Sequence, residues 1–139
     1  MDNIILKKIW EEADLIEIEV SINSEFVVAK ANYYVSTNSI LDCQKIIFEF
    51  INNNSKECNL EFGKIGEGYV PSFKLNLSQD RTGHVLIDVF FELDDESMPK
   101  HQCSCYIKTE IGLLANFADK IKSLAYSSLG TRISLLPEI

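Results

Sequence analysis

The chain has 139 residues, of which 46% are hydrophobic and 24% charged, and its net charge is −8. This composition argues against a disordered chain, and the lack of any apolar run of about 18 residues argues against a membrane span. The N-terminal residues carry no secretory signal pattern, so we expect the protein in the cytoplasm. The length predicts a single domain over residues 1–139. The acidic net charge disfavours sequence-independent binding to nucleic acid.

The N-terminal part of the chain predicts strands. Residues 3–12 fit a short helix and one face of a strand almost equally well, and both alternatives are kept. Over 15–22, isoleucine and valine alternate with glutamate and serine, which predicts a strand with one buried face. After a turn at Asn23 and Ser24, residues 25–35 are rich in Val, Ala and Tyr and predict a second strand.

A helix is predicted directly after these strands, over residues 39–52. Ser39 and Asp42 match a capping box, and apolar side chains recur at helical spacing until a run of asparagines, which tolerate the left-handed backbone of a helix end. Alternation over 58–62 then predicts another strand. The glycine-rich link 63–68 lacks the spacing of a phosphate-binding loop and precedes a strand, so we assign it no phosphate.

The clearest pattern is a hairpin over residues 73–93, on which the other elements are expected to pack. Both of its arms alternate apolar and polar side chains, as strands with one buried face do. The polar link 79–83 ends in Gly83, as a hairpin with a short loop requires.

The C-terminal part predicts a strand over 101–108 and then a long helix over 110–129, with Thr109 as its cap. The helix carries a regular apolar stripe: Ile111, Leu114, Phe117, Ala118, Ile121, Leu124 and Ala125. The apolar tail 131–139 is expected either to dock as an extra strand or to bind a neighbour.

The order of these elements predicts an α+β fold with antiparallel β-sheets and two long amphipathic helices. If residues 3–12 supply a strand, the chain approximates two units of strands followed by a helix, over 3–54 and 57–130. Few identities align between the two units, so the topology would repeat and the sequence would not.

The motifs predict no catalytic residues, no metal site and no cofactor. The cysteines form no C-x-x-C pair, which favours small buried thiols over a zinc or redox site: Cys43, Cys58, Cys103 and Cys105. His84, with Asp80 or Asp88 near it in sequence, is a conceivable general base. A lone histidine at a strand edge is more often exposed or bonded to the backbone.

Clustered acidic side chains are the stronger functional signal. One set lies at the end of the hairpin and in the loop after it: Asp88, Glu92, Asp94, Asp95 and Glu96. A second set is Glu17 and Glu19 on the wetter face of the strand 15–22. Like charges gathered on one face cost stability, so the clustering suggests a binding role, with an ordinary solvated face as the alternative.

The arrangement of these segments resembles that of immunity proteins from bacterial contact-dependent growth inhibition and related polymorphic toxin systems. The resemblance covers about residues 17–129. It rests on three stretches of sequence: Tyr34-Val35-Ser36 before the first helix, Leu75 through Gly83-His84-Val85 to Phe91, and Ile111 through Phe117 to Leu124. Some such immunity proteins are similar to the Whirly fold, in which four strands and a helix are repeated twice.

The resemblance implies a cytoplasmic, non-catalytic protein that binds and neutralises a cognate toxin C-terminal domain. Such toxins are often nucleases with a basic surface, which an acidic inhibitor complements. We therefore expect the toxin to contact the two acidic sets. No membrane partner is expected, and the sequence does not predict an oligomeric state. Two alternatives stay open, a nucleic-acid-binding module of Whirly-like fold and a small enzyme using His84. A neighbouring gene for a large secreted toxin would separate the first reading from these two.

Overall fold

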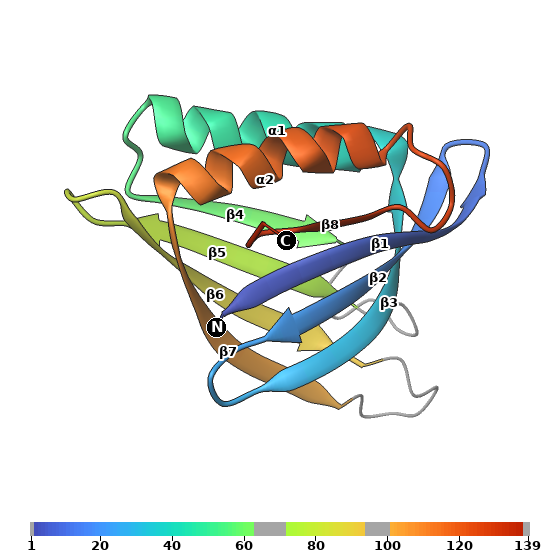
Figure 1. Cartoon of the computed structure of the whole chain (residues 1–139), viewed down its shortest axis with the longest axis horizontal. Coiled ribbons are helices and arrows are strands. Elements are labelled where there is room, and N and C mark those ends of the chain that lie inside the picture. Colours follow the sequence, from blue (N-terminus) through green and yellow to red (C-terminus); the bar gives the residue numbers. More distant parts are fainter. Residues whose placement is uncertain (1, 63–71, 94–100, 138–139) are drawn as a thin grey trace.

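The computed structural model describes residues 2–62, 72–93 and 101–137 and has an α+β fold with two antiparallel sheets and two helices (Figure 1). The first sheet has the order β3-β2-β1-β8 and contains β1 (Asn3–Glu12), β2 (Leu15–Asn23), β3 (Val28–Ser36) and β8 (Arg132–Ser134). The second has the order β4-β5-β6-β7 and contains β4 (Glu57–Phe62), β5 (Phe73–Gln79), β6 (His84–Glu92) and β7 (Gln102–Glu110). Helix α1 (Thr37–Asn52) follows β3, and α2 (Ile111–Leu124) follows β7. The predicted fold class is confirmed at this level.

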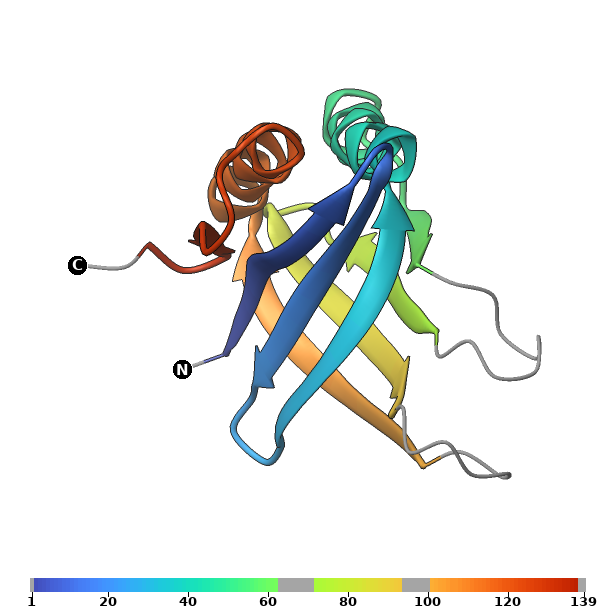
Figure 2. The same cartoon turned by 90° about the vertical axis from the view of Figure 1, so that its right-hand side faces the viewer.

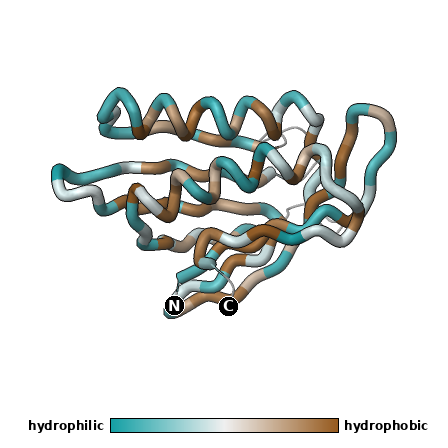
Figure 3. Tube along the Cα trace, turned by 45° about the horizontal axis from the view of Figure 1, so that its top comes forward, coloured by the Kyte–Doolittle hydropathy of each residue, from teal (hydrophilic) through white to brown (hydrophobic). Residues whose placement is uncertain are grey.

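The two sheets face each other beneath a side-by-side pair of helices (Figure 2). Hydrophobic and hydrophilic residues alternate along the strands (Figure 3), so each sheet contributes one apolar face to a shared core. The hairpin predicted over 73–93 is confirmed as β5 and β6, which pair from Phe73 opposite Phe91 to Gln79 opposite Val85.

Tyr33 joins the two sheets across this core. Its ring lies 5.5 Å from that of Phe73, centroid to centroid, and its hydroxyl donates to the backbone oxygen of Glu92 at 2.8 Å. Burial, with the nearby Glu92 carboxylate, raises the pKa of Tyr33 above its usual range. The hydroxyl therefore stays protonated and keeps its donor role.

Residues 3–12, which the sequence left open between helix and strand, form β1. This strand pairs with β2 on one side and β8 on the other, and its register shifts between Lys8 and Trp10. The tail therefore docks as an extra strand, with Arg132 opposite Lys7. The second predicted strand was placed to start at residue 25, but residues 24–27 form the turn and β3 begins at Val28.

The predicted cap of the first helix was wrong. The helix begins at Thr37, two residues early, and its cap is Ser36, whose Oγ accepts from the Ser39 backbone N–H at 3.1 Å. Ser36 is still part of the extended strand, which leaves its side chain free to cap the next turn. At the other end, Asn54 has a φ of +50°, as expected for the asparagine run.

The predicted bounds of the second helix were also wrong. β7 continues to Glu110, because Thr109 and Glu110 still pair with Val85 and His84 of β6. Thr109 is therefore a buried strand residue and not a cap, and α2 ends at Leu124 instead of residue 129. Within the described ranges, neither helix is long and apolar enough to cross a membrane.

Candidate functional site

A groove of about 940 Å³ runs beside β7, the last strand of the second sheet. Its walls are formed by Asp2 near the N-terminus, the turn between β2 and β3, and strands β6 and β7. The start of α2 and the tail after β8 complete them. The apolar lining residues are Phe26, Val27, Leu86, Tyr106, Leu113 and Leu136.

Two aromatic side chains of this groove are strongly exposed. Phe26 is 88% exposed and Tyr106 58%. Ser24 holds the turn that carries Phe26, since its Oγ accepts from the backbone N–H groups of Phe26 and Val27 at 3.3 and 3.0 Å. A single exposed apolar side chain is ordinary, but a group of them around one groove is typical of a binding surface.

The outer edge of β7 offers backbone groups to this groove. The Lys108 N–H donates to the Asp2 carboxylate at 2.9 Å, so it points away from β6. Because backbone direction alternates along a strand, the N–H groups of Tyr106 and Ser104 point to the same free side. No strand of the described chain pairs with this side of β7.

The charges around the groove are mainly acidic. Asp2, Glu25 and Glu110 line it, against one lysine, Lys108. His84 lies at the same end as Glu110, its partner residue in the β6–β7 ladder. The groove therefore combines apolar anchors, negative charge and a strand edge that no strand of the described residues pairs with.

His84 does lie near Asp80, one of the two acids considered for it. Its Nδ1 is 3.4 Å from the Asp80 carboxylate and 2.8 Å from the Thr82 hydroxyl. Asp80 in turn accepts from the Thr82 hydroxyl and from the N–H groups of Thr82 and His84, and these bonds, the Thr82 hydroxyl first, lower the pKa of Asp80 to about 2. The cluster closes the hairpin turn, which is a structural role. Asp88 lies further along β6, opposite Asn76 and Tyr106.

The structure separates the predicted acidic residues. Asp88 is exposed beside Tyr106, whereas the Glu92 carboxylate is buried and accepts from the backbone N–H and the hydroxyl of Ser72 at 3.2 and 2.8 Å. Glu92 thus binds Ser72, the residue directly before β5, and its carboxylate is not placed to meet a partner directly. Asp94, Asp95 and Glu96, like the link 63–68, lie outside the described residues.

Glu17 and Glu19 lie on the outer face of the other sheet. Glu19 is 3.6 Å from Lys30 and opposite Lys7, so cations offset its charge. Glu17 lies between Trp10 and Tyr34, whose rings meet edge to face with centroids 5.8 Å apart. Asp88, on β6 of the second sheet, therefore lies on a different sheet from Glu17 and Glu19.

The cysteines are free thiols, with Cys43 and Cys105 buried and Cys58 and Cys103 half-buried. Burial raises the pKa of Cys43 to about 12 and that of Cys58 to about 11, so both stay as thiols at neutral pH. Across residues 2–62, 72–93 and 101–137, no three His, Cys, Asp or Glu side chains gather as metal ligands do.

Sequence reasoning missed the groove, although parts of the signal were present. The alternation over 101–108 places Tyr106 on the face opposite the cysteines, and Phe26 stands beside a predicted turn. Their proximity to one groove depends on how the two sheets pack. No protein-family model, curated protein or solved structure matches the chain.

Proposed function

We propose that the chain is an immunity protein, which binds a cognate bacterial toxin domain and neutralises it without catalysis. The observation that supports this most is the groove beside β7, where exposed aromatic side chains meet acidic side chains and the outer edge of that strand. Protein interfaces of high affinity use aromatic anchors surrounded by polar side chains. The proposal also draws on the resemblance to immunity proteins of contact-dependent growth inhibition.

The proposal includes a fold related to Whirly proteins. It is supported by two four-stranded antiparallel sheets, each with a helix after its third or fourth strand. The chain departs from two equal units, because only three strands precede α1 and the fourth strand of the first sheet, β8, comes from the C-terminal tail. A closing strand of this kind ties the two halves of the chain together.

The proposed toxin is basic, as a nuclease would be. A net charge of −8 speeds association with such a partner through long-range attraction. Of the acidic residues, Asp88 and the loop residues Asp94, Asp95 and Glu96 remain the proposed contacts. Glu17 and Glu19 are the second candidate, and Glu92 is left out because its carboxylate is buried.

Co-purification tests the proposal directly. Any candidate toxin domain encoded beside the gene for this chain is produced together with it, and the proposal predicts a stable complex and protection of cells. Asp94→Ser, Asp95→Ser and Glu96→Ser together should weaken binding. Thermal stability should change little if these charges face solvent, as the sequence predicts, since exposed ion pairs contribute under about 1 kcal/mol each.

Ile87→Asp is the matched structural control, because a carboxylate in the core should unfold the hairpin and abolish protection. If the triple variant binds toxin like the original chain at low and high salt, the loop is not part of the contact. If no toxin domain encoded nearby binds the chain, the immunity proposal fails.

Nucleic-acid binding is the second candidate function, and one observation favours it. Lys7, Lys30 and Arg132 line a groove of about 540 Å³ on the outer face of the first sheet. The Trp10–Tyr34 ring pair lies on the same face. Cations next to aromatic rings are typical of single-strand binding, although Glu17 and Glu19 share this face and reduce its positive charge.

A further inference from the structure

The edge of β7 and the groove beside it suit a particular ligand. We propose that the groove binds an extended, basic segment of a partner protein, which adds to the second sheet as a strand next to β7 and packs apolar side chains against Phe26 and Tyr106. This inference rests on the proposed function, because it specifies which part of a toxin domain the chain would hold and how.

The backbone of β7 is prepared for strand addition. The strand has 9 residues, which at about 3.3 Å per residue gives an edge of about 30 Å. Ser104, Tyr106 and Lys108 turn their backbone groups to the free side, and the Asp2 carboxylate already accepts from the Lys108 N–H. The N–H of Lys108 thus already has an acceptor from outside the sheet. An added strand would supply such acceptors to the outward N–H groups along its length.

The side chains around this edge provide the anchors. Successive side chains of an added strand point to opposite faces, so every second one would turn towards the outer face of the sheet, where Tyr106 and Leu86 lie. Phe26 stands across the groove on a turn fixed by Ser24. A ligand that alternates apolar and polar residues therefore fits this groove better than a helix or a flat surface.

Charge selects a basic segment over a second copy of this chain. The groove has three carboxylates, Asp2, Glu25 and Glu110, against Lys108. Pairing β7 with β7 of another copy would bring two acidic grooves together, and like charges across an interface disfavour binding.

The experiment uses the full chain and two synthetic peptides of about ten residues, one alternating Lys with Val and the other Glu with Val. Binding is measured by titration of labelled peptide, and backbone amide exchange of the chain is followed by NMR. We expect the basic peptide to bind at least about tenfold more tightly than the acidic one. Exchange should slow at Ser104 and Tyr106, because an added strand gives their N–H groups partners.

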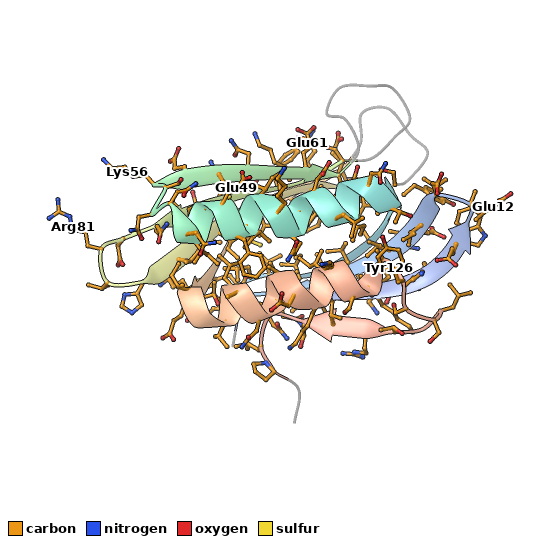
Figure 4. The ribbon with its side chains drawn as sticks, turned by 90° about the horizontal axis from the view of Figure 1, so that it is seen from above. Glu12, Glu49, Lys56, Glu61, Arg81 and Tyr126 are labelled. Carbon is orange, nitrogen blue, oxygen red and sulfur yellow. The ribbon has the colours of Figure 1, made fainter. Side chains whose placement is uncertain are left out.

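Three variants separate strand addition from general attraction between opposite charges. Ser104→Pro removes one outward N–H at an edge position that tolerates proline, and Phe26→Ala removes an anchor; each should weaken the basic peptide by at least about tenfold. Tyr126→Ala is the matched control, since Tyr126 is 72% exposed at the opposite end of α2 from the groove (Figure 4) and should leave binding unchanged.

Equal binding of both peptides, no binding by the original chain, or full binding by Ser104→Pro would overturn strand addition. Dimerisation of the chain that Ser104→Pro abolishes would overturn it too, because the occupant is then a second copy. The proposed function fails separately. If the toxin domain co-purifies equally with Ser104→Pro, the immunity proposal stands and strand addition is wrong. If the basic peptide binds as expected but no toxin domain binds, strand addition stands and the immunity proposal is wrong.

Discussion

Lys8 is a charged side chain at the centre of the fold, and it is fully buried. Its ammonium donates to the backbone oxygens of Ala125 and Ser127 at 3.3 and 2.8 Å and pairs with the Glu11 carboxylate. Carbonyls just past a helix C-terminus have no intrahelical partners and carry partial negative charge. Lys8 therefore fastens β1 to the end of α2 and satisfies the carbonyls where that helix stops.

Replacing Lys8 with Met tests this role. The variant leaves the buried Ala125 carbonyl and the half-buried Ser127 carbonyl without their donor, so we expect the free energy of unfolding to fall by about 2–4 kcal/mol. Lys7→Met is the control, because Lys7 lies on the outer face and should change stability by under about 1 kcal/mol. Urea denaturation measures both, and equal stabilities would contradict the role given to Lys8.

The turn residue Asp80 gives a prediction in pH. Its carboxylate should titrate at a pKa of about 2, and Thr82→Ala should raise that pKa towards 3.8, because the Thr82 hydroxyl is the strongest contributor to the shift. A lowered pKa in the folded state means that the stabilisation is present above the unfolded pKa and is lost as pH falls through about 2. NMR titration of the carboxyl carbon measures the shift; an unchanged pKa in Thr82→Ala would refute it.

The β5–β6 hairpin depends on the backbone conformation of Gly83 in its turn. Gly83 has a φ of +86°, a region that side chains with a Cβ rarely adopt, and its carbonyl accepts from the N–H of Ile111 at the start of α2. The turn thus sets both the register of the hairpin and the beginning of the helix.

Gly83→Ala should lower the free energy of unfolding by about 1 kcal/mol or more, because of the positive φ and not of crowding. The nearest atom to the added methyl group would be Ile111 Cγ1 at an ordinary 3.9 Å. Gly112→Ala is the matched control in α2, where nothing lies within 4 Å and alanine favours the helix. Thermal unfolding compares the two variants. If Gly83→Ala were as stable as the original chain, the positive φ of Gly83 would not be needed for this turn.

The C-terminal tail is a structural element of the first sheet. Ile133 and Leu135 are buried, and the Leu135 N–H donates to the Ile4 carbonyl at 2.9 Å. Leu135→Ala should therefore lower the free energy of unfolding by about 2–4 kcal/mol. Leu129→Ala, at a site 59% exposed, should change it by under about 0.5 kcal/mol. Similar small effects in both variants would show that the tail detaches in solution.

At the scale of the whole molecule, charge is distributed unevenly. Carboxylates line the β7 groove, whereas Lys7, Lys30 and Arg132 gather on the outer face of the first sheet. The Arg81 side chain extends outward from the tip of the β5–β6 turn (Figure 4). The β7 groove is therefore mainly acidic, whereas the outer face of the first sheet carries both cations and the carboxylates of Glu17 and Glu19.

We predict no appreciable binding of the chain to single-stranded oligonucleotides at physiological salt, because its net charge of −8 repels phosphates. Titration across a salt series measures this. Micromolar binding that weakens steeply with salt, and that Lys30→Glu abolishes, would instead favour the nucleic-acid-binding alternative.

The sequence by itself determined the strands in which apolar and polar residues alternate, and which face of each strand packs into the core. The reason is that a slip of one residue would expose a whole apolar face, so β2, β5, β6 and β7 have one stable orientation. The apolar stripe of α2 was determined in the same way, and all of its predicted members except Ile111 are buried. Such patterns are local, and each segment carries its own evidence.

Only the tertiary structure decided the features that depend on distant partners. Residues 3–12 become a strand because β2 and β8 pair with its two edges. Helix α2 stops at Leu124, and Lys8 binds the carbonyls of Ala125 and Ser127 just past its end. Glu92 is not part of an acidic surface, because its carboxylate is buried and accepts a hydrogen bond from Ser72. The groove forms because packing of the two sheets brings the β2–β3 turn to the edge of β7, a contact between segments that no local pattern connects.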